Sequence, residues 1–306
     1  MALRELHSPP RILPLYARTL APLVPGASRL PWVGGGGGEI PDLELSLAHV
    51  QAERARVAEY ARVCAFAPAQ ELPATFVHVL AFPLHLALMS DGRFPLAAVG
   101  LVHIANRIAQ QRPIRLDEPL ELRVRATPLL AHPRGRTFAL ISEARVNGEL
   151  VWWECSTMLR RGPGSGSQRG EQAPALPFGA DGERWRLGED LGRRYAAVSG
   201  DRNPIHMHAL SARALGFPRA IAHGMWTKAR CLAALQQAGS AQLNGAFSVD
   251  VRFRRPILLP TTVAFTSAAA GTEIAFGVRD AATGSEHLDG RLRTLADISE
   301  AQEDEH

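Results

Sequence analysis

The chain repeats itself, and this repeat limits the folds that it can adopt. The tetrapeptide QRPI at residues 111–114 recurs as RRPI at residues 254–257, each time after a strand-like segment. Upstream, residues 78–100 and 223–245 have the same length, both begin with histidine and end with glycine, and each holds an apolar, helix-like run. A chain of 306 residues has room for two domains of common size. We therefore expect two similar folding units in tandem.

Both units continue downstream as three segments that are typical of strands. In the first unit these cover residues 120–126, 137–146 and 150–159, and in the second they cover residues 262–266, 273–279 and 287–295. Asn147-Gly148 and Thr283-Gly284 suit the hairpin turns. A meander with one apolar face must cover that face, and the preceding helix is available to do so. Each unit is therefore predicted to be α+β, with a helix packed on an antiparallel sheet.

Segments of irregular composition flank the two units. Residues 1–44 are rich in proline and include a glycine run at residues 34–38, which lacks the Gly-Lys-Ser/Thr ending and the preceding strand of a phosphate loop. We predict an irregular segment there. Residues 161–180 read RGPGSGSQRGEQAPALPFGA, which is typical of a linker. The two folding units are accordingly placed at residues 45–160 and 181–298.

Composition argues against several functional classes. The net charge of +4 comes almost entirely from scattered arginines, so we expect no nucleic-acid partner. Cys64, Cys155 and Cys231 stand far apart without a CxxC pair, which argues against disulfides and against a structural zinc site. No apolar run approaches the ~20 residues that span a bilayer, and arginines and prolines come before any apolar run of signal-peptide length. We expect a cytoplasmic protein without a membrane partner.

The strongest chemical signal lies at residues 195–225, which read YAAVSGDRNPIHMHALSARALGFPRAIAHGM. Asp201 and His206 are five residues apart, and Pro204 between them disfavours a regular helix, so a loop can bring both side chains to one point. A water held between them can be deprotonated and can supply the proton in turn. Histidine suits this acid–base role because its ordinary pKa lies near neutrality.

Gly224 precedes a helix-like run at residues 225–236, so its backbone N–H is expected at a helix start. Unpaired amides there carry partial positive charge and suit an oxyanion, and glycine lets a substrate carbonyl approach the backbone. We group Asn203 and His223 with the substrate-binding residues in a supporting role. Asn203 would brace the loop, and His223 would pack or bond beneath the turn. Because the first unit retains an equivalent His78, a structural role is favoured for His223.

The order D-x-N-P-[LI]-H followed by H-G-M resembles the signature of the MaoC-like (R)-specific enoyl-CoA hydratases and 3-hydroxyacyl dehydratases. The matching residues are Asp201, Asn203, Pro204, Ile205, His206, His223, Gly224 and Met225. The resemblance implies a pseudo-dimeric double hotdog, in which a long helix of each unit is wrapped by an antiparallel sheet. It also implies (R)-stereochemistry, coenzyme A or acyl-carrier-protein thioesters as substrates, and no cofactor beyond that carrier. It assigns Asp201 and His206 as the acid–base pair.

The two units differ where this chemistry would lie. Aligning residues 60–68 with residues 195–204 sets Phe66 opposite Asp201, and the first unit has no counterpart of His206. We therefore expect residues 45–160 to form a degenerate hotdog and residues 181–298 to form the catalytic one. We also expect the apolar interior of the degenerate unit to accommodate an acyl chain.

Two other functions stay open at this point. A hotdog thioesterase would direct water to the carbonyl carbon, and a non-catalytic acyl-thioester-binding subunit of a lipid-synthesis assembly would need no acid–base pair. Alternation places Arg252 and Arg254 on one strand face, where they either meet carrier phosphates or form a solvated strand end. No metal is expected, because the nearby histidines lack carboxylate or cysteine spacing. A tandem pair can complete the hotdog dimer within one chain, so a monomer and a homodimer are both compatible.

Overall fold

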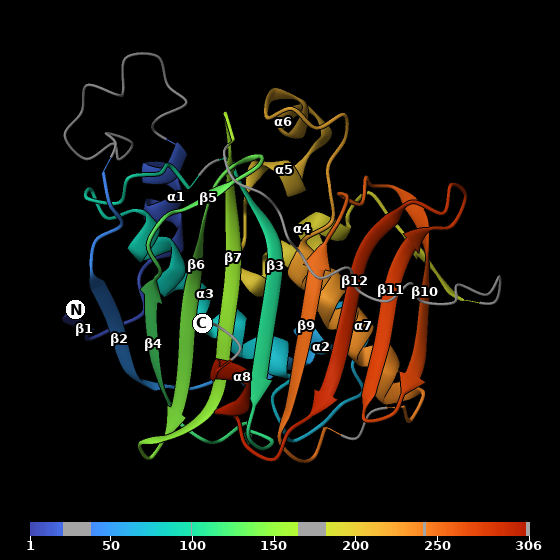
Figure 1. The fold of residues 1–306 in the computed structure, drawn as a ribbon, viewed down its shortest axis with the longest axis horizontal. Helices are drawn as coiled ribbons and strands as arrows, with labels where there is room; N and C mark the ends of the chain where they lie inside the picture. The colour runs from blue at the N-terminus through green and yellow to red at the C-terminus, as the bar shows by residue number, and fades with distance from the viewer. Residues whose placement is uncertain (21–37, 99, 165–181, 241–242, 304–306) are drawn as a thin grey trace.

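A computed structural model describes residues 1–20, 38–98, 100–164, 182–240 and 243–303 (Figure 1). Within these residues twelve strands form one sheet in the order β1-β2-β4-β6-β7-β3-β9-β12-β11-β10-β8, with β5 paired to β6. The strands are β1 Ala2–Leu6, β2 Leu43–Val50, β3 Leu101–Gln110, β4 Leu120–Ala126, β5 Leu130–His132, β6 Gly135–Val146, β7 Glu149–Arg161, β8 Glu183–Leu187, β9 Phe247–Phe253, β10 Thr261–Ala270, β11 Glu273–Asp280 and β12 Glu286–Thr294. The helices are α1 Ile12–Leu20, α2 Arg54–Cys64, α3 Ala74–Met89, α4 Leu191–Ser199, α5 Pro204–Met207, α6 Ala209–Ala214, α7 Gly224–Gln237 and α8 Glu300–Glu303.

The sheet consists of two matching halves. The order β2-β4-β6-β7-β3 toward the middle of the sheet is repeated by β8-β10-β11-β12-β9, and all neighbours within these two sets are antiparallel. The helices repeat as well, since α2 and α3 of the first half correspond to α4 and α7 of the second. The predicted α+β class is therefore confirmed, and the sequence repeat corresponds to a structural one.

The two halves meet edge to edge in the middle of the sheet. Strand β3 pairs antiparallel with β9, from Ala105 opposite Arg252 to Gln110 opposite Phe247. Because this pairing satisfies the backbone of two strands that would otherwise be edges, it joins the halves into one continuous sheet. Helices α3 and α7 lie side by side behind that sheet (Figure 1).

One hydrophobic core extends through both halves beneath the sheet. Helix α3 reads ATFVHVLAFPLHLALM and is buried on nearly every side, as its apolar composition requires. Tyr60 of α2 and Tyr195 of α4 occupy equivalent positions and lie with ring centroids 6.0 Å apart. A smaller cluster around Trp153 is covered by the C-terminal segment, with α8 on the other face of the sheet (Figure 1). No helix in the described part of the chain is both long and apolar enough to cross a membrane.

The prediction of an irregular segment at residues 1–44 is wrong for two elements. Strand β1 pairs parallel with β2, and α1 places Ile12, Leu15 and Tyr16 against the core. Pro14 is tolerated because it lies in the first turn of α1, where backbone N–H groups have no intrahelical partner. Most of the glycine run, residues 34–37, and most of the predicted linker, residues 165–180, lie outside the described residues.

Candidate active site

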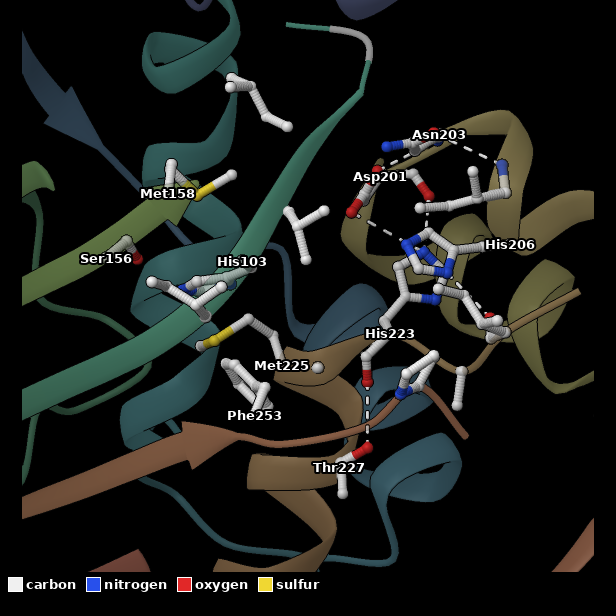
Figure 2. Close-up of a pocket in the computed structure, with 18 of the residues that line it drawn as sticks. His103, Ser156, Met158, Asp201, Asn203, His206, His223, Met225, Thr227 and Phe253 are labelled. Atoms are coloured by element: carbon white, nitrogen blue, oxygen red, sulfur yellow. Dashed lines mark hydrogen bonds and ion pairs between the residues drawn. The ribbon is translucent and has the colours of Figure 1, made fainter. Parts of the chain in front are cut away.

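A cavity of about 280 Å³ is lined by residues from both halves of the molecule. The second half contributes Asp201, Asn203, His206, His223 and Gly224, so the structure brings the residues of the sequence motif together around one space. The first half contributes polar and apolar side chains that include His78, His85, His103, Ser156 and Met158. Figure 2 shows His103, Ser156 and Met158 across the cavity from Asp201 and His206.

The loop that carries the motif is shaped by a helix end and a helix start. Helix α4 ends at Gly200, whose φ of 83° is a left-handed conformation that glycine adopts without strain. The Asp201 N–H donates to Ser199 Oγ over 3.1 Å, so Ser199 is a turn residue. Asn203 then caps α5, because its side-chain oxygen accepts from the Ile205 N–H over 3.4 Å. These bonds hold Asp201 and His206 on either side of the turn.

The Asp201 carboxylate is anchored by a residue that sequence reasoning missed. Its Oδ1 accepts from the Tyr16 hydroxyl over 2.7 Å and from the Asn203 N–H over 3.1 Å. The Tyr16 oxygen in turn accepts from the Arg202 N–H over 2.8 Å. Burial raises the pKa of Asp201, but His223, His206 and the Tyr16 bond outweigh it and lower the pKa below its usual value. Asp201 is therefore ionised at neutral pH.

His206 is buried and held in one tautomer. Its Nδ1 lies 2.8 Å from the Ile221 carbonyl oxygen, and because a carbonyl only accepts, Nδ1 must carry the hydrogen. In the neutral ring Nε2 is then a bare acceptor. Burial lowers the pKa of His206 from its usual value, which keeps the ring neutral at pH 7. His206 thus presents a base rather than a cation.

His223 supports the loop from below. Its Nε2 lies 3.0 Å from the Asp201 carbonyl oxygen, to which it donates, and its ring stacks on His206 with centroids 3.6 Å apart. Burial and the neighbouring His206 lower the pKa of His223 to about 3, so the ring is neutral. This is the hydrogen bond beneath the turn that the motif suggested.

The polar atoms of Asp201, His206 and His223 lie close together. One carboxylate oxygen of Asp201 and one ring nitrogen each of His206 and His223 lie within 4.8 Å of one another. A single water can therefore bond to Asp201 and His206 at ordinary hydrogen-bond distances. The same trio has the composition of a metal site. However, imidazole lone pairs lie in the ring plane, and the near-parallel stacking of His206 and His223, at 26°, directs them alongside each other rather than to one ion.

Gly224 is the first residue of α7 and lines the cavity. Its backbone N–H therefore belongs to the first turn, where amides have no intrahelical acceptor. A Cβ added at this position would meet the Phe253 ring at 2.9 Å, so a side chain would displace that ring. The helix start and the close packing together explain why glycine stands here.

The two candidate arginines are separated. Strand β9 ends at Phe253, so the strand alternation expected to pair Arg252 with Arg254 does not continue to position 254. Arg254 lines the active-site cavity and donates to the Asp289 carboxylate. Arg252 lines a different pocket, next to Asp250. The expectation that Arg252 and Arg254 lie on one face is therefore wrong, and of these two only Arg254 lines the active-site cavity.

Replacement of Tyr16 with phenylalanine should lower kcat/KM about tenfold, because it removes a hydrogen bond to a carboxylate and leaves Asp201 less firmly held. The pKa of Asp201 should rise, since that bond helps to lower it. Steady-state kinetics as a function of pH measure both effects. Tyr60→Phe is the matched control, because the Tyr60 hydroxyl bonds to Thr75 Oγ1, 2.9 Å away. Equal losses in the two variants would contradict a specific role for Tyr16.

The buried histidines predict that the protein loses stability in mild acid. Burial lowers the pKa of His85 and His223 to about 3 and that of His103 to about 4. Unfolded histidines take up protons below about pH 6.5, while these three stay neutral when folded. The unfolded state therefore binds more protons between about pH 6.5 and 4, and the free energy of unfolding falls by several kcal/mol as the pH drops through this range. Urea unfolding at pH 7.5 and pH 5 tests this, and equal values would refute it.

Comparison with known proteins shows what this arrangement is similar to. Residues 179–290 match the model of the MaoC-like domain. Over 261 residues the chain is 34% identical to 3-hydroxyacyl-thioester dehydratase X of Mycobacterium tuberculosis, an alignment that covers 84% of this chain and 91% of the relative. The chain belongs to the MaoC-like family. Membership also confirms the prediction of an enzyme of the dehydratase, or hydro-lyase, class.

Solved structures agree with this MaoC-like assignment. The crystal structure of HtdX from M. tuberculosis matches with a TM-score of 0.71 at 32% identity, over 82% of this chain and 100% of that one. A MaoC-like dehydratase from Phytophthora capsici matches at 0.64 and 16% identity, over 83% and 95% of the two chains. A conserved M. tuberculosis protein with a double hotdog fold matches at 0.51 and 15% identity, over 85% and 96%. The last two show the fold alone, and the predicted double hotdog is confirmed.

Proposed function

We propose that this MaoC-like protein catalyses the reversible hydration of trans-2-enoyl thioesters, which is the dehydration of (R)-3-hydroxyacyl thioesters in the other direction. The supporting observation is the convergence of an ionised Asp201 oxygen and a ring nitrogen of neutral His206 within 4.8 Å, in a cavity that Gly224 also lines. The (R) configuration is the one that the family resemblance implies.

The proton transfer follows from the charge states of the pair. A water bound between Asp201 and His206 gives a proton to the bare Nε2 of His206, while the ionised carboxylate accepts its other hydrogen and orients it. The resulting hydroxide adds to C3 of the enoyl group. The proton on His206 then passes to C2, so one water supplies both the hydroxyl group and the new C–H bond. Such acid–base catalysis contributes about 10²–10⁴-fold.

The negative charge that develops on the thioester oxygen needs a donor. We assign this role to the N–H of Gly224, because it lies in the first turn of α7 and carries the partial positive charge of a helix N-terminus. Amides in that position need no reorganisation during the reaction, so they stabilise the enolate-like state more than the substrate.

The carrier is proposed to be coenzyme A or the phosphopantetheine of an acyl-carrier protein. Arg254 and Arg255 line the cavity and offer positive charge for its phosphates, although Arg254 shares its charge with Asp289. No further cofactor takes part in the proposed reaction. A cytoplasmic location and the choice between monomer and homodimer stay predictions.

The test is the loss of enoyl-thioester absorbance when crotonyl-CoA and a longer trans-2-enoyl-CoA are mixed with the protein. Hydration of either substrate to the (R) product, resolved by chiral chromatography, supports the proposal. Carrier-protein thioesters are tested next if neither CoA substrate reacts. Release of free thiol from saturated acyl-CoA would instead identify a thioesterase, and no reaction with any thioester would favour the binding-subunit interpretation.

A further inference from the structure

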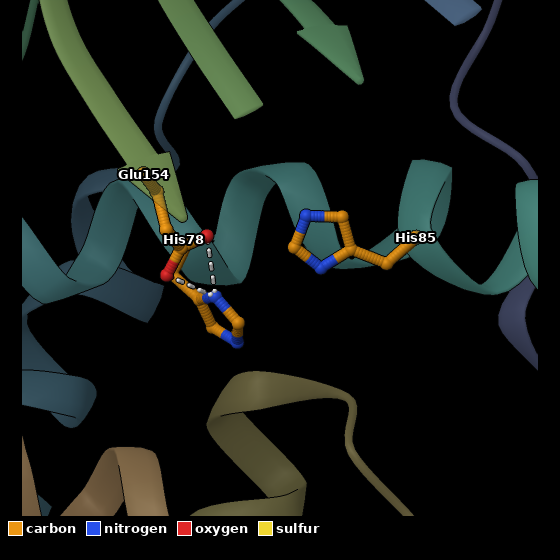
Figure 3. A group of neighbouring side chains, drawn as sticks. All are labelled: His78, His85 and Glu154. Carbon is orange, nitrogen blue, oxygen red and sulfur yellow. Dashed lines mark hydrogen bonds and ion pairs between the residues drawn. The ribbon is translucent and has the colours of Figure 1, made fainter. Parts of the chain in front are cut away.

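The part of the cavity that the first half of the molecule lines contains a buried ionic group. We had expected an apolar interior there. Glu154 on β7 has no solvent exposure, and both of its carboxylate oxygens lie near Nδ1 of His78, at 2.8 and 2.9 Å. Figure 3 shows the second ring nitrogen of His78 directed away from the carboxylate. A buried carboxylate is costly unless it is paired and hydrogen-bonded, so this position calls for an explanation.

A second set of bonds fixes the orientation of this pair. The Asn106 side-chain nitrogen donates to Glu154 Oε1 over 2.6 Å and to Ser156 Oγ over 2.9 Å. Lys228, the only lysine of the chain, donates to the Asn106 side-chain oxygen and to the Val249 carbonyl, 2.9 Å away. Because an ionised carboxylate can only accept, the Asn106 nitrogen must face Glu154, and its oxygen then faces Lys228. The amide therefore cannot flip. Three neighbours favour the charged form of Glu154, namely His78, His85 and Asn106.

These contacts determine the charge of Glu154. Burial raises the pKa of Glu154, but His78, His85 and the Asn106 bond outweigh it and lower the pKa to about 2. Glu154 is thus ionised and accepts the Nδ1 hydrogen of His78. The His78 imidazole is held by a full negative charge, with Nε2 left for a ligand.

Two further polar groups meet the same cavity. His103 Nε2 is buried and has no hydrogen-bond partner among the described residues. Burial keeps the ring neutral, because it lowers the pKa of His103 to about 4. Ser156 Oγ accepts from Asn106, which leaves its hydroxyl hydrogen to donate. His78, His103 and Ser156 all line the cavity.

This cluster is specific to the first half. Glu154 pairs with Ile108 on β3, and the repeat places Val251 on β9 in the equivalent position. Val251 pairs with Gly290, so the second half has no carboxylate there. The half without the catalytic loop therefore carries its own polar group, on the other side of the cavity.

We propose that His78, His103 and Ser156 form a second subsite, which binds a hydroxyl group carried on the acyl chain beyond C3. A hydroxyl both accepts and donates, so it can accept from Ser156 and can satisfy His103 Nε2 in either tautomer of the ring. A plain hydrocarbon chain would leave that nitrogen buried and unsatisfied. This inference rests on the proposed function, and it adds the class of acyl group.

A metal ion is the competing occupant, because His78, His85 and Glu154 have ligand atoms within 4.8 Å of one another. Two contacts favour the hydroxyl. The His85 Nε2 atom is already bonded to Ser142 Oγ over 2.7 Å. The Asn106 nitrogen donates to Glu154 Oε1, so that carboxylate oxygen is already engaged in a hydrogen bond.

The test uses saturated ligands that cannot be hydrated, so that it is independent of turnover. Isothermal titration compares octanoyl-CoA with its 5-, 6-, 7- and 8-hydroxy derivatives. We expect one or two of the hydroxylated ligands to bind about tenfold more tightly than octanoyl-CoA. His103→Leu should reduce this ratio of Kd values to near one, and Ser156→Ala, which adds no bulk, should reduce it in part. His7→Leu, on the exposed N-terminal segment, is the matched control.

Three results would overturn the subsite. The first is that no hydroxylated ligand binds more tightly than octanoyl-CoA to the wild type. The second is an unchanged ratio in both His103→Leu and Ser156→Ala. The third is stoichiometric divalent metal in the purified protein that is lost in Glu154→Gln. Failure of the proposed function is seen separately, as absence of enoyl-thioester hydration while this binding preference is retained.

Discussion

Replacement of Asp201 with asparagine is expected to lower kcat/KM for trans-2-enoyl thioesters by about 10²–10⁴-fold. The amide keeps the size of the side chain and can still accept from the Tyr16 hydroxyl and the Asn203 N–H, so the loop should hold its shape. What the variant lacks is the negative charge that orients the water and stabilises the imidazolium formed on His206. The loss should therefore fall mainly on kcat, measured with crotonyl-CoA and a longer enoyl-CoA.

Thermal melting separates this effect from misfolding, since the melting temperature of Asp201→Asn should stay close to that of the wild type. Asp117→Asn serves as the control, because Asp117 is exposed and pairs only with Arg115 among the contacts described. Retention of most of the wild-type turnover in Asp201→Asn would rule out the acid–base pair. It would show that a group other than Asp201 supports the reaction.

The second large effect is expected for His206→Asn. The asparagine side-chain nitrogen can take the place of Nδ1 and still donate to the Ile221 carbonyl, whereas no atom replaces the bare Nε2. We expect kcat/KM to fall by about 10²–10⁴-fold with little change in melting temperature. His208→Asn is the matched control, since His208 is exposed and lies two residues further along the chain.

The pH profile gives this variant a second readout. His206 acts as a base only when neutral, so wild-type kcat/KM should decline as the pH falls through the pKa of His206. Burial lowers that pKa, so the midpoint should lie below the ordinary value of about 6.5. The residual activity of His206→Asn should lack this decline. A midpoint above 6.5, or the same decline in the variant, would show that another group titrates.

Much of the fold could be predicted because its elements have patterns that are short in sequence, and because each pattern occurs in both halves of the chain. The apolar helix and the three later strands of each half carry short-range patterns, and comparison of the two copies aligned Phe66 with Asp201. The structure agrees with that alignment, since Ala65 and Gly200 end equivalent helices in the same left-handed conformation. Strands β2 and β8 were missed, because each lies before its helix and is defined by a partner distant in sequence.

The site was predictable only where its residues are neighbours in the chain. Asp201, His206 and Gly224 lie within one short segment, so their spacing indicates that they can meet. Tyr16 bonds to Asp201 across 185 residues, and no local pattern marks that contact. The Glu154 cluster was missed for the same physical reason, because its charge is balanced by side chains from three other elements.

The pairing of β3 with β9 joins two halves of one chain, so the two halves need not have the same sequence, as the subunits of a symmetric dimer must. In a dimer of identical chains every substitution occurs in both subunits, so a residue cannot change in one subunit and stay the same in the other. Here equivalent positions hold different residues, Phe66 against Asp201 and Glu154 against Gly290. A library of variants confined to the first half should therefore alter which substrates are accepted, while the groups that perform the reaction stay untouched.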